Sequence, residues 1–247
     1  MANINSIVQP RTRYPILGFP VDLQPNYAKA LFTRFDQDLG THVVTLNAEM
    51  VMQGEKNPEL AEIIHNAEFV IPDGAGIVLY LKLKGKPVHR CPGIELAQSL
   101  LNQIGTEKRS NSIIFYGGQP GVSQQAADQL KQQFPSLNIL AYHGYLDDRQ
   151  TEQLHRSLTE LQPQLILVGL GVPRQELWIK KHRSLCPHAI WIGVGGSFDI
   201  WSGQKKRAPA WFCEHHLEWL YRLYQEPWRW RRMLVLPQFA IKALISR

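Results

Sequence analysis

The chain has 247 residues, of which 44% are hydrophobic and 19% are charged, a composition typical of a globular protein that buries its core without disulfides. The three cysteines are odd in number and far apart in the chain, which favours a reducing cytoplasm and argues against a zinc site. The formal net charge is +6, which favours an anionic partner over an uncharged one.

In the first half of the chain, apolar residues at helical spacing alternate with short apolar runs. This pattern predicts a helix over residues 26–39, a buried strand over 42–47 and a second helix over 57–67. A short strand then runs into a glycine-rich turn over residues 69–76, and another helix begins at residue 93.

The second half repeats the alternation more regularly. Strands are predicted over residues 112–118, 137–145, 165–171 and 189–196, separated by helices over 120–134, 148–161 and 173–185. Strand–helix alternation at this spacing indicates a parallel sheet, and continuous apolar strands indicate that both faces of the sheet are covered. The expected fold is therefore α/β: a Rossmann-like parallel sheet with helices on both faces, followed by a helical C-terminal appendage.

The appendage differs from the rest of the chain in charge and in aromatic content. From residue 205 to the end there are nine Lys and Arg residues and three Asp and Glu residues, so these 43 residues carry the whole net charge. Four tryptophans are interleaved with arginines, in a segment expected to be helical on both sides of Pro227. We expect an α/β core over residues 1–206 and a basic, aromatic appendage over 207–247, which suits an anionic partner.

Neither end of the chain has the pattern of a membrane-targeting or membrane-spanning segment. The N-terminal sequence has no apolar stretch of the kind found in a secretory signal. The apolar run from Met233 to Ile245 is interrupted by Pro237 and Lys242 and is shorter than the roughly 20 residues of a spanning helix. We expect a protein that does not cross a membrane.

Ligands of open α/β sheets bind beyond the carboxyl ends of the strands. Five such ends are polar or rich in glycine: residues 45–47, 73–76, 117–121, 169–176 and 193–196. Glycines allow backbone N–H groups to approach a diphosphate, although each loop alone is equally compatible with a tight turn that binds nothing. Gly169 and Gly171 are followed by Arg174 where a dinucleotide fingerprint needs glycine, so a nicotinamide-dependent oxidoreductase is only an alternative.

Asp73 is the best candidate for a catalytic group, because a carboxylate at a strand end can take a proton from a sugar hydroxyl. It is also compatible with a simple helix cap. The Asp36-Gln37-Asp38 sequence matches the metal-binding pattern of many glycosyltransferases, but it falls on the polar face of the first predicted helix. Cys213, His215 and His216 are too sparse for a metal site. The sequence predicts no metal and no cofactor.

Several motifs together resemble the WecG/TagA/CpsF family of glycosyltransferases, which add a sugar to lipid-linked intermediates of cell-surface polymers. The matching sequences are Thr45-x-Asn47, Pro72-Asp73-Gly74-x-Gly76, Arg90-x-x-Gly93, Gly117-Gly118 with Pro120-Gly121, His143-Gly144-Tyr145, Gly169-Leu170-Gly171-x-Pro173-Arg174-Gln175-Glu176, Gly193-Val194-Gly195-Gly196-x-Phe198-Asp199, Gly203-x-x-x-Arg207-Ala208-Pro209, Glu218-Trp219-x-x-Arg222-Leu223 and Glu226-Pro227-x-Arg229-x-x-Arg232. They follow the family's order over residues 40–235. Glu95 and Cys91 depart from the family pattern near the acceptor region.

The resemblance implies an inverting, metal-independent transfer with Asp73 as the general base. It also implies a substrate site, whose residues we expect to be Thr45, Asn47, Arg90, Gln175, Gly117, Gly118, Gly171, Glu176 and Gly195. Arginines of the appendage are expected at the acceptor diphosphate: Arg207, Arg222, Arg229 and Arg232.

The implied donor is a UDP-sugar of the N-acetylmannosamine type, and the implied acceptor is a polyprenyl-diphosphate-linked sugar used in polysaccharide or teichoic-acid-like synthesis. The expected location is the cytoplasm, peripheral on the inner face of the plasma membrane and in contact with its anionic surface. Assembly as a homo-oligomer is left open. A nucleic-acid-binding protein that uses the basic, aromatic tail is a second alternative, but it leaves the polar strand ends over residues 45–76 without a role.

Overall fold

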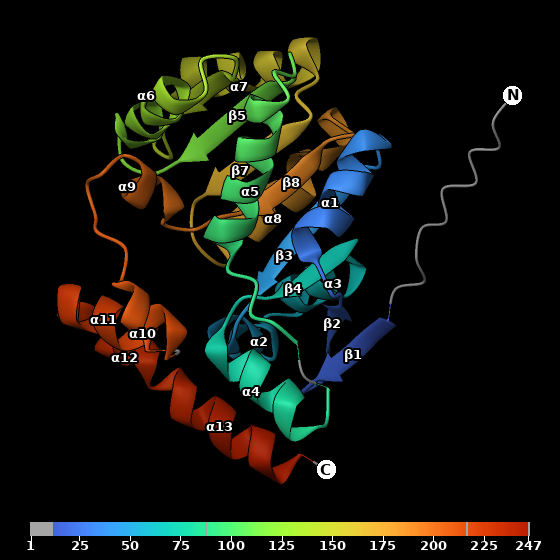
Figure 1. Cartoon of the computed structure of the whole chain (residues 1–247), viewed down its shortest axis with the longest axis vertical. Helices are drawn as coiled ribbons and strands as arrows, with labels where there is room; N and C mark the ends of the chain where they lie inside the picture. The colour runs from blue at the N-terminus through green and yellow to red at the C-terminus, as the bar shows by residue number, and fades with distance from the viewer. Residues whose placement is uncertain (1–11, 87, 216, 247) are drawn as a thin grey trace, which may run out of the picture.

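The computed structural model describes residues 12–86, 88–215 and 217–246, and for Arg229 the backbone alone. Within these residues a parallel six-stranded sheet has the order β4-β3-β8-β7-β5-β6 (Figure 1). The strands are β3 (Thr41–Leu46), β4 (Phe69–Pro72), β5 (Ser112–Gly117), β6 (Asn138–Tyr142), β7 (Leu165–Gly169) and β8 (Ile190–Gly193). The expected parallel α/β sheet is confirmed.

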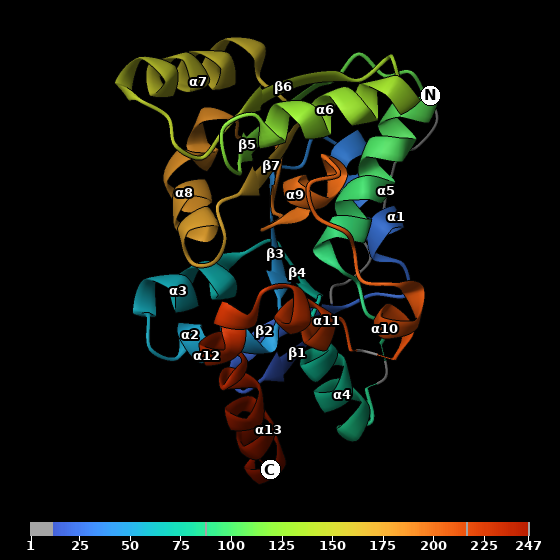
Figure 2. The same cartoon turned by 90° about the vertical axis from the view of Figure 1, so that its left-hand side faces the viewer.

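Helices cover both faces of the sheet (Figure 2). Successive strand residues point to opposite faces, so Val43 and Ile113 join the core beneath one layer while Val44 and Ile114 face the other. The first layer holds α1 (Tyr27–Asp36), α5 (Gly93–Thr106) and α6 (Val122–Gln133). The second holds α2 (Ala48–Gly54), α3 (Pro58–Asn66), α4 (Ala75–Leu83), α7 (Asp148–Leu161) and α8 (Arg174–His182), followed by the short helix η1 (Arg183–Leu185). The short helix α9 (Ser197–Trp201) packs in the first layer against α6.

An antiparallel hairpin of β1 (Thr12–Ile16) and β2 (Phe19–Leu23) precedes the sheet, and the sequence did not predict it. Asp22 of β2 is fully buried. Its Oδ2 accepts a hydrogen bond of 2.7 Å from the backbone N of Val70 in β4, and its Oδ1 accepts one of 2.9 Å from Nε of Arg13. The hairpin thus satisfies a backbone donor at the outer edge of the sheet, where an unpaired strand would invite non-native pairing.

The first helix is shorter than predicted. It ends at Asp36, Gln37 caps it and Asp38 adopts a left-handed backbone conformation. Asp36 forms an ion pair with Arg109 at 2.5 Å, and Asp38 accepts a hydrogen bond of 2.9 Å from Gln164. Both carboxylates therefore lie at the amino-terminal edge of the sheet, away from the ligand-binding edge. The sequence placed the two aspartates on the polar face of a helix, whereas the structure places them where the helix ends in a turn.

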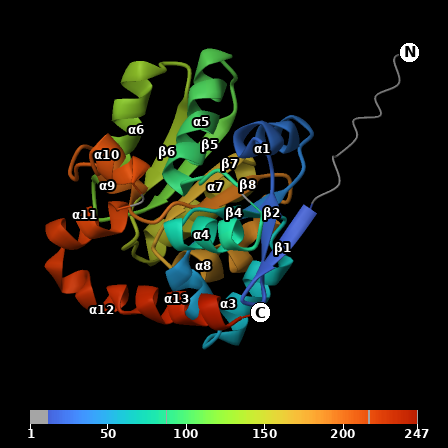
Figure 3. The same cartoon turned by 60° about the horizontal axis from the view of Figure 1, so that its bottom comes forward.

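The C-terminal region is helical on both sides of Pro227, as expected. Its elements are α10 (Ala210–Glu214), α11 (Glu218–Gln225), η2 (Pro227–Arg229), α12 (Trp230–Met233) and α13 (Val235–Ile245). Figure 3 shows α11, α12 and α13 forming an arc around α4. Phe239 of α13 is buried against α2 and α4, and this contact fixes α13 on the α/β part of the molecule.

Candidate active site

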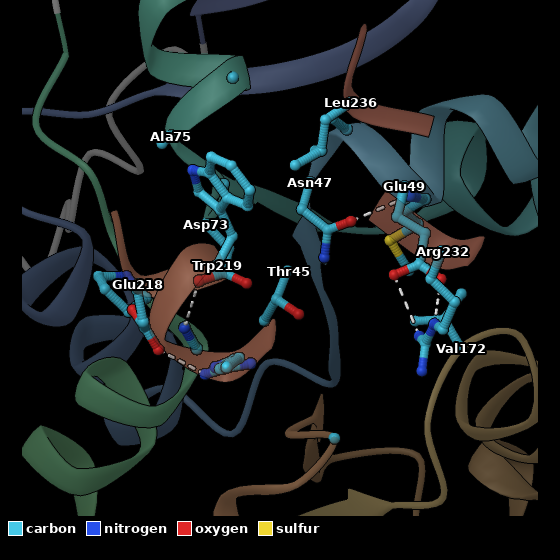
Figure 4. A pocket seen from close by; sticks show the side chains of 18 of the residues that line it. Thr45, Asn47, Glu49, Asp73, Ala75, Val172, Glu218, Trp219, Arg232 and Leu236 are labelled. Atoms are coloured by element: carbon cyan, nitrogen blue, oxygen red, sulfur yellow. Dashed lines mark hydrogen bonds and ion pairs between the residues drawn. The ribbon is translucent and has the colours of Figure 1, made fainter. Parts of the chain in front are cut away.

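A cavity of about 1060 Å³ lies between the carboxyl ends of the strands and the C-terminal helices. The three adjacent strands β4, β3 and β8 end at it, which is where open α/β sheets bind ligands. Ten of the residues expected at the site line this cavity: Thr45, Asn47, Asp73, Arg90, Gly171, Gln175, Gly195, Arg207, Arg222 and Arg232. Figure 4 shows several of them converging from the strand ends and from the C-terminal helices.

Asp73 follows directly on β4, and its backbone is held on both sides. Its N donates to the carbonyl oxygen of Leu46 at 3.0 Å, and its own carbonyl oxygen accepts from Nε of Arg90 at 2.6 Å. Oδ1 accepts a longer hydrogen bond, 3.3 Å, from the backbone N of Gly93. A half-buried carboxylate is thus presented to the cavity in a fixed position.

The surroundings of Asp73 set its proton affinity. Burial is the largest influence and raises the pKa of the carboxyl; Arg90 and Arg222 lower it and Glu218 raises it, and the net pKa lies above the usual aspartate value. A carboxylate whose pKa is raised toward the working pH is a better general base than an ordinary aspartate.

Thr45 and Asn47 stand at the end of β3. The hydroxyl of Thr45 donates to the carbonyl oxygen of Gly193 at 3.3 Å, which joins β3 to β8. Oδ1 of Asn47 accepts from the backbone N of Met50 at 3.0 Å and caps α2. Because that bond fixes the amide, the side-chain nitrogen of Asn47 is turned toward the cavity (Figure 4), where it can donate to a ligand oxygen.

Gln175 lines the cavity and begins a series of hydrogen-bonded side chains that is otherwise buried. Its Oε1 accepts from the backbone N of Gly195 at 3.1 Å, and its Nε2 donates to Glu176 at 2.9 Å. The other oxygen of Glu176 lies 2.7 Å from Nε2 of His42, and both of these side chains are buried. The chain fixes Gln175 and the Gly195 loop together at the end of β8.

Glu176 was expected to bind substrate; in the structure it is fully buried and holds Gln175 and His42. His42 was missed by the sequence analysis. A titratable residue within an otherwise apolar strand is the signal that could have found it, because a buried polar group needs a partner.

The four glycines expected at the site fall into two pairs. Gly171 and Gly195 line the cavity with positive φ, and a Cβ at either position would meet open space, so their backbone is accessible to a ligand. Gly117 and Gly118 are absent from the cavity lining that the described residues form. A Cβ on Gly117 would lie 2.4 Å from the carbonyl oxygen of Gly169, so this glycine allows the close approach of β5 and β7.

The arginines at the cavity are each matched by a carboxylate. Glu218 of α11 accepts from Arg90 at 2.8 Å and from Arg222 at 2.5 Å. Burial raises the pKa of Glu218, but Arg222 and Arg90 outweigh it and the net pKa is lowered. Two bonds of 2.8 and 3.0 Å join Arg232 to Glu49 (Figure 4).

Two further arginines were expected here. Arg207 pairs with Glu95, and its Nε is a buried donor without a hydrogen-bond partner among the described residues. Arg229 lies in η2, and its side chain falls outside the described part of the structure. Glu49 and Glu218 were not predicted as partners of the arginines, because they reach the site only through the positions of α2 and α11 in space.

Comparison with known proteins identifies the family. A family model described as "Glycosyl transferase WecG/TagA/CpsF family" matches residues 14–247. The chain belongs to this glycosyltransferase family. It is 39% identical over 214 residues to an N-acetylglucosaminyldiphosphoundecaprenol N-acetyl-beta-D-mannosaminyltransferase of Bacillus spizizenii, covering 86% of this chain and 82% of the relative.

Two further relatives carry the same name. The Bacillus subtilis protein is 34% identical over 211 residues, covering 85% of this chain and 81% of its own length. The Staphylococcus aureus protein is 32% identical over 201 residues, covering 81% and 78%. The family membership favours the transferase over the oxidoreductase and the nucleic-acid-binding protein that the sequence left open.

The described residues of the glycosyltransferase contain no group of three or more His, Cys, Asp and Glu side chains placed to hold a metal ion. Of the candidate ligands Cys213, His215 and His216, two lie in the described part of the structure: Cys213 donates to the carbonyl oxygen of Ala208, and His215 stacks on Trp211. Among the helices that the structure describes, none is long and apolar enough to cross a membrane.

Proposed function

We propose that the chain transfers an N-acetylmannosaminyl group from a UDP-linked donor to N-acetylglucosamine carried on a polyprenyl diphosphate, with inversion and without a metal ion. The observation that carries the proposal is the half-buried Asp73 carboxylate, which faces a cavity that four arginines also line: Arg90, Arg207, Arg222 and Arg232. The names of the relatives support both the transferred sugar and the acceptor.

In the proposed reaction, Asp73 takes the proton of the attacking hydroxyl of the acceptor sugar. The hydroxyl oxygen forms a bond to the anomeric carbon of the donor as the bond from that carbon to the UDP oxygen breaks, and UDP leaves with the electron pair. Transition-state stabilisation then depends on donors that are already in place. The accessible backbone at Gly171 and Gly195 supports this role, as does the amide of Asn47.

The arginines suit the two diphosphates of this reaction, because a guanidinium pairs with two phosphate oxygens at once. Arg222 and Arg232 are each held by a glutamate at the cavity. A diphosphate has the same bidentate acceptor geometry as these carboxylates, so it can replace Glu218 and Glu49 as their partner on binding.

The proposal places the enzyme on the cytoplasmic face of the plasma membrane, with residues 1–206 as the catalytic core and 207–247 as the membrane-contacting appendage. Exposed tryptophans support this, since Trp211, Trp228 and Trp230 are each more than half exposed and tryptophan suits the headgroup layer. The excess of basic residues after residue 205 favours an anionic leaflet.

The test is to incubate the protein with a panel of UDP-sugars and a GlcNAc-diphosphate lipid, and to measure the mass of the lipid. The expected result is the mass increment of one N-acetylhexosamine with UDP-N-acetylmannosamine and none with the other donors. The Asp73→Asn variant is the matched control. A lipid that gains no sugar from any donor, or gains it equally with the Asn variant, refutes the proposal.

A further inference from the structure

An apolar groove leads away from Asp73 and forms part of the cavity wall. It is lined on one side by α4, with Leu79 and Leu83 one and two helical turns beyond the start of the helix. On the other side it is lined by Leu236, Ala240 and Leu244 of α13. The proposed transfer chemistry uses none of these side chains.

The direction of the groove follows from three contacts between the two helices, which lie side by side in Figures 1 and 2. Near the start of α4, the ring of Phe239 lies 3.4 Å from where a Cβ on Gly76 would be. Near its end, Lys84 Nζ donates to the carbonyl oxygen of Ser246 at 2.6 Å, and the Tyr80 hydroxyl lies 3.4 Å from the hydroxyl of the same residue. The helices therefore run in the same direction, away from Asp73, for about 12 Å.

The outer end of the groove is open and apolar. Leu83 is 63% and Leu244 is 76% exposed, which is unusual for leucines that line a cavity in a protein with a well-formed core. Lys82 and Lys86 are exposed beside this end. Apolar side chains flanked by lysines suit contact with an anionic bilayer surface.

We propose that this groove, between α4 and α13, binds the first isoprene units of the polyprenyl chain of the acceptor. The inference rests on the proposed function, and it adds a binding site for the lipid portion. One cavity offers a surface for each part of the acceptor: Asp73 for the sugar, Arg222 and Arg232 for the diphosphate, and Leu79, Leu83 and Leu244 for the prenyl chain.

The alternative is that these leucines only insert into the bilayer and contact no acceptor. The chain offers a control that separates the two. Ile241 and Ile245 are also exposed on α13, at 58% and 73%, but they are not among the residues that line the cavity. Insertion into the bilayer depends on both pairs of side chains, the leucines and the isoleucines. Binding of a prenyl chain in the groove depends on Leu83 and Leu244 alone.

The test uses GlcNAc-diphosphate acceptors that carry either a methyl group or a farnesyl chain, in solution without vesicles and below the micelle concentration of the farnesyl compound. For the wild type, we expect kcat/KM to be at least tenfold higher for the farnesyl acceptor. In the Leu83→Ser, Leu244→Ser double variant, the ratio of the two kcat/KM values falls by roughly tenfold, since less apolar surface contacts the chain. In the Ile241→Ser, Ile245→Ser control the ratio is unchanged.

A wild-type ratio near one overturns the groove while leaving the transferase intact, and so does an equal fall of the ratio in the control variant. If the wild type glycosylates neither acceptor, the proposed function fails and the groove fails with it. A second measurement needs no variant: a photoreactive group at the end of the farnesyl chain is expected to label α4 and α13 of the wild-type protein. Labelling confined to other elements also overturns the proposal.

Discussion

The guanidinium of Arg90 donates to the carboxylate of Glu218 at 2.8 Å, and this contact joins the segment beside the catalytic aspartate to helix α11. The same guanidinium donates through Nε to the carbonyl oxygen of Asp73 at 2.6 Å. Glu218 in turn binds Arg222, one turn further along its helix. The position of α11 and the geometry at Asp73 are therefore set by one buried glutamate.

We expect the Glu218→Gln substitution to loosen α11 from the rest of the protein. The variant keeps a hydrogen-bond acceptor but loses the charge that two arginines share, at a cost of about 1.5 kcal/mol in the free energy of unfolding. Limited proteolysis would show faster cleavage around residues 203–217. Glu214→Gln, at an exposed position of α10, is the matched control, and equal cleavage of both variants would contradict this assignment.

The lowered pKa of Glu218 gives the contact a defined pH dependence. A glutamate whose pKa is lower in the folded state stabilises that state at pH values above its usual pKa, and the stabilisation is lost as pH falls through the lowered folded value. Proteolysis of the wild type around residues 203–217 should therefore stay slow at neutral pH and accelerate only in acid. Glu218→Gln should lack that acid transition.

Replacing Asp73 by Asn should lower kcat by about 10²–10⁴-fold, the usual effect of losing a general base. UDP binding, measured by calorimetry, should be nearly unchanged, because the backbone contacts of residue 73 remain. A variant with near wild-type kcat would exclude Asp73 as the base.

The pH–rate profile offers an independent check on Asp73. Because burial raises the pKa of Asp73, the acid limb of the kcat/KM profile should lie at a higher pH than an ordinary aspartate would give. Arg90 lowers this pKa and Glu218 raises it, so Arg90→Met should move the limb to higher pH and Glu218→Gln to lower pH. If the acid limb of the profile does not move in either variant, it reports the titration of a group other than Asp73.

The buried pair of His42 and Glu176 should act on catalysis through Gln175. His42→Leu leaves a buried carboxylate without its partner and should cost about 3 kcal/mol of stability. Replacing both residues, His42→Leu with Glu176→Met, should regain most of that stability, because no buried charge remains. Activity should stay low in the double variant, since Nε2 of Gln175 loses its acceptor on Glu176. Recovery of activity along with stability would reduce the pair to a purely structural role.

Transfer should continue at full rate in excess EDTA. The carboxylate of Glu218, which acts on Asp73, is engaged by two arginines. The Asp36–Asp38 sequence lies at the opposite edge of the sheet, so electrostatic stabilisation falls to arginines and backbone donors. Measuring initial rates with and without EDTA, and with added Mn²⁺, checks this. A rate that is lost in EDTA and restored by Mn²⁺ would require a metal site.

The sequence predicted the sheet well because its parallel strands are continuous apolar runs, and it predicted Asp73 because the carboxylate follows such a run directly. It missed the first hairpin, because Pro15 and Pro20 argue against strands, yet they face each other across the hairpin. Helix α4 was not predicted: its first two residues were assigned to the glycine-rich turn, because Gly74 and Gly76 flank Ala75, and residues 77–83 were left unassigned. The roles of Glu176 and Glu218 depend on partners more than 100 residues away, a proximity that local pattern does not encode.

The exposed aromatic and basic side chains of the C-terminal helices should hold the enzyme on an anionic membrane. Trp228 is 71% exposed, Arg231 is exposed beside Trp230, and neither Trp228 nor Arg231 lines the cavity. Each basic residue near an anionic leaflet contributes about 1 kcal/mol. Trp228→Ser with Arg231→Glu should therefore release the protein from vesicles of anionic phospholipid in a sedimentation assay, and more completely at high salt.

Because these two side chains lie outside the cavity, the same variant should still glycosylate the soluble methyl acceptor at the wild-type rate. Leu161→Ser with Arg156→Glu makes the same kinds of change at exposed positions of α7 and should leave vesicle binding intact. Transfer to a vesicle-bound lipid acceptor should fall in the first variant alone, since the enzyme must reach an acceptor that stays in the bilayer. If the Trp228 and Arg231 variant sediments with vesicles as the wild type does, the membrane contact lies on another face of the protein.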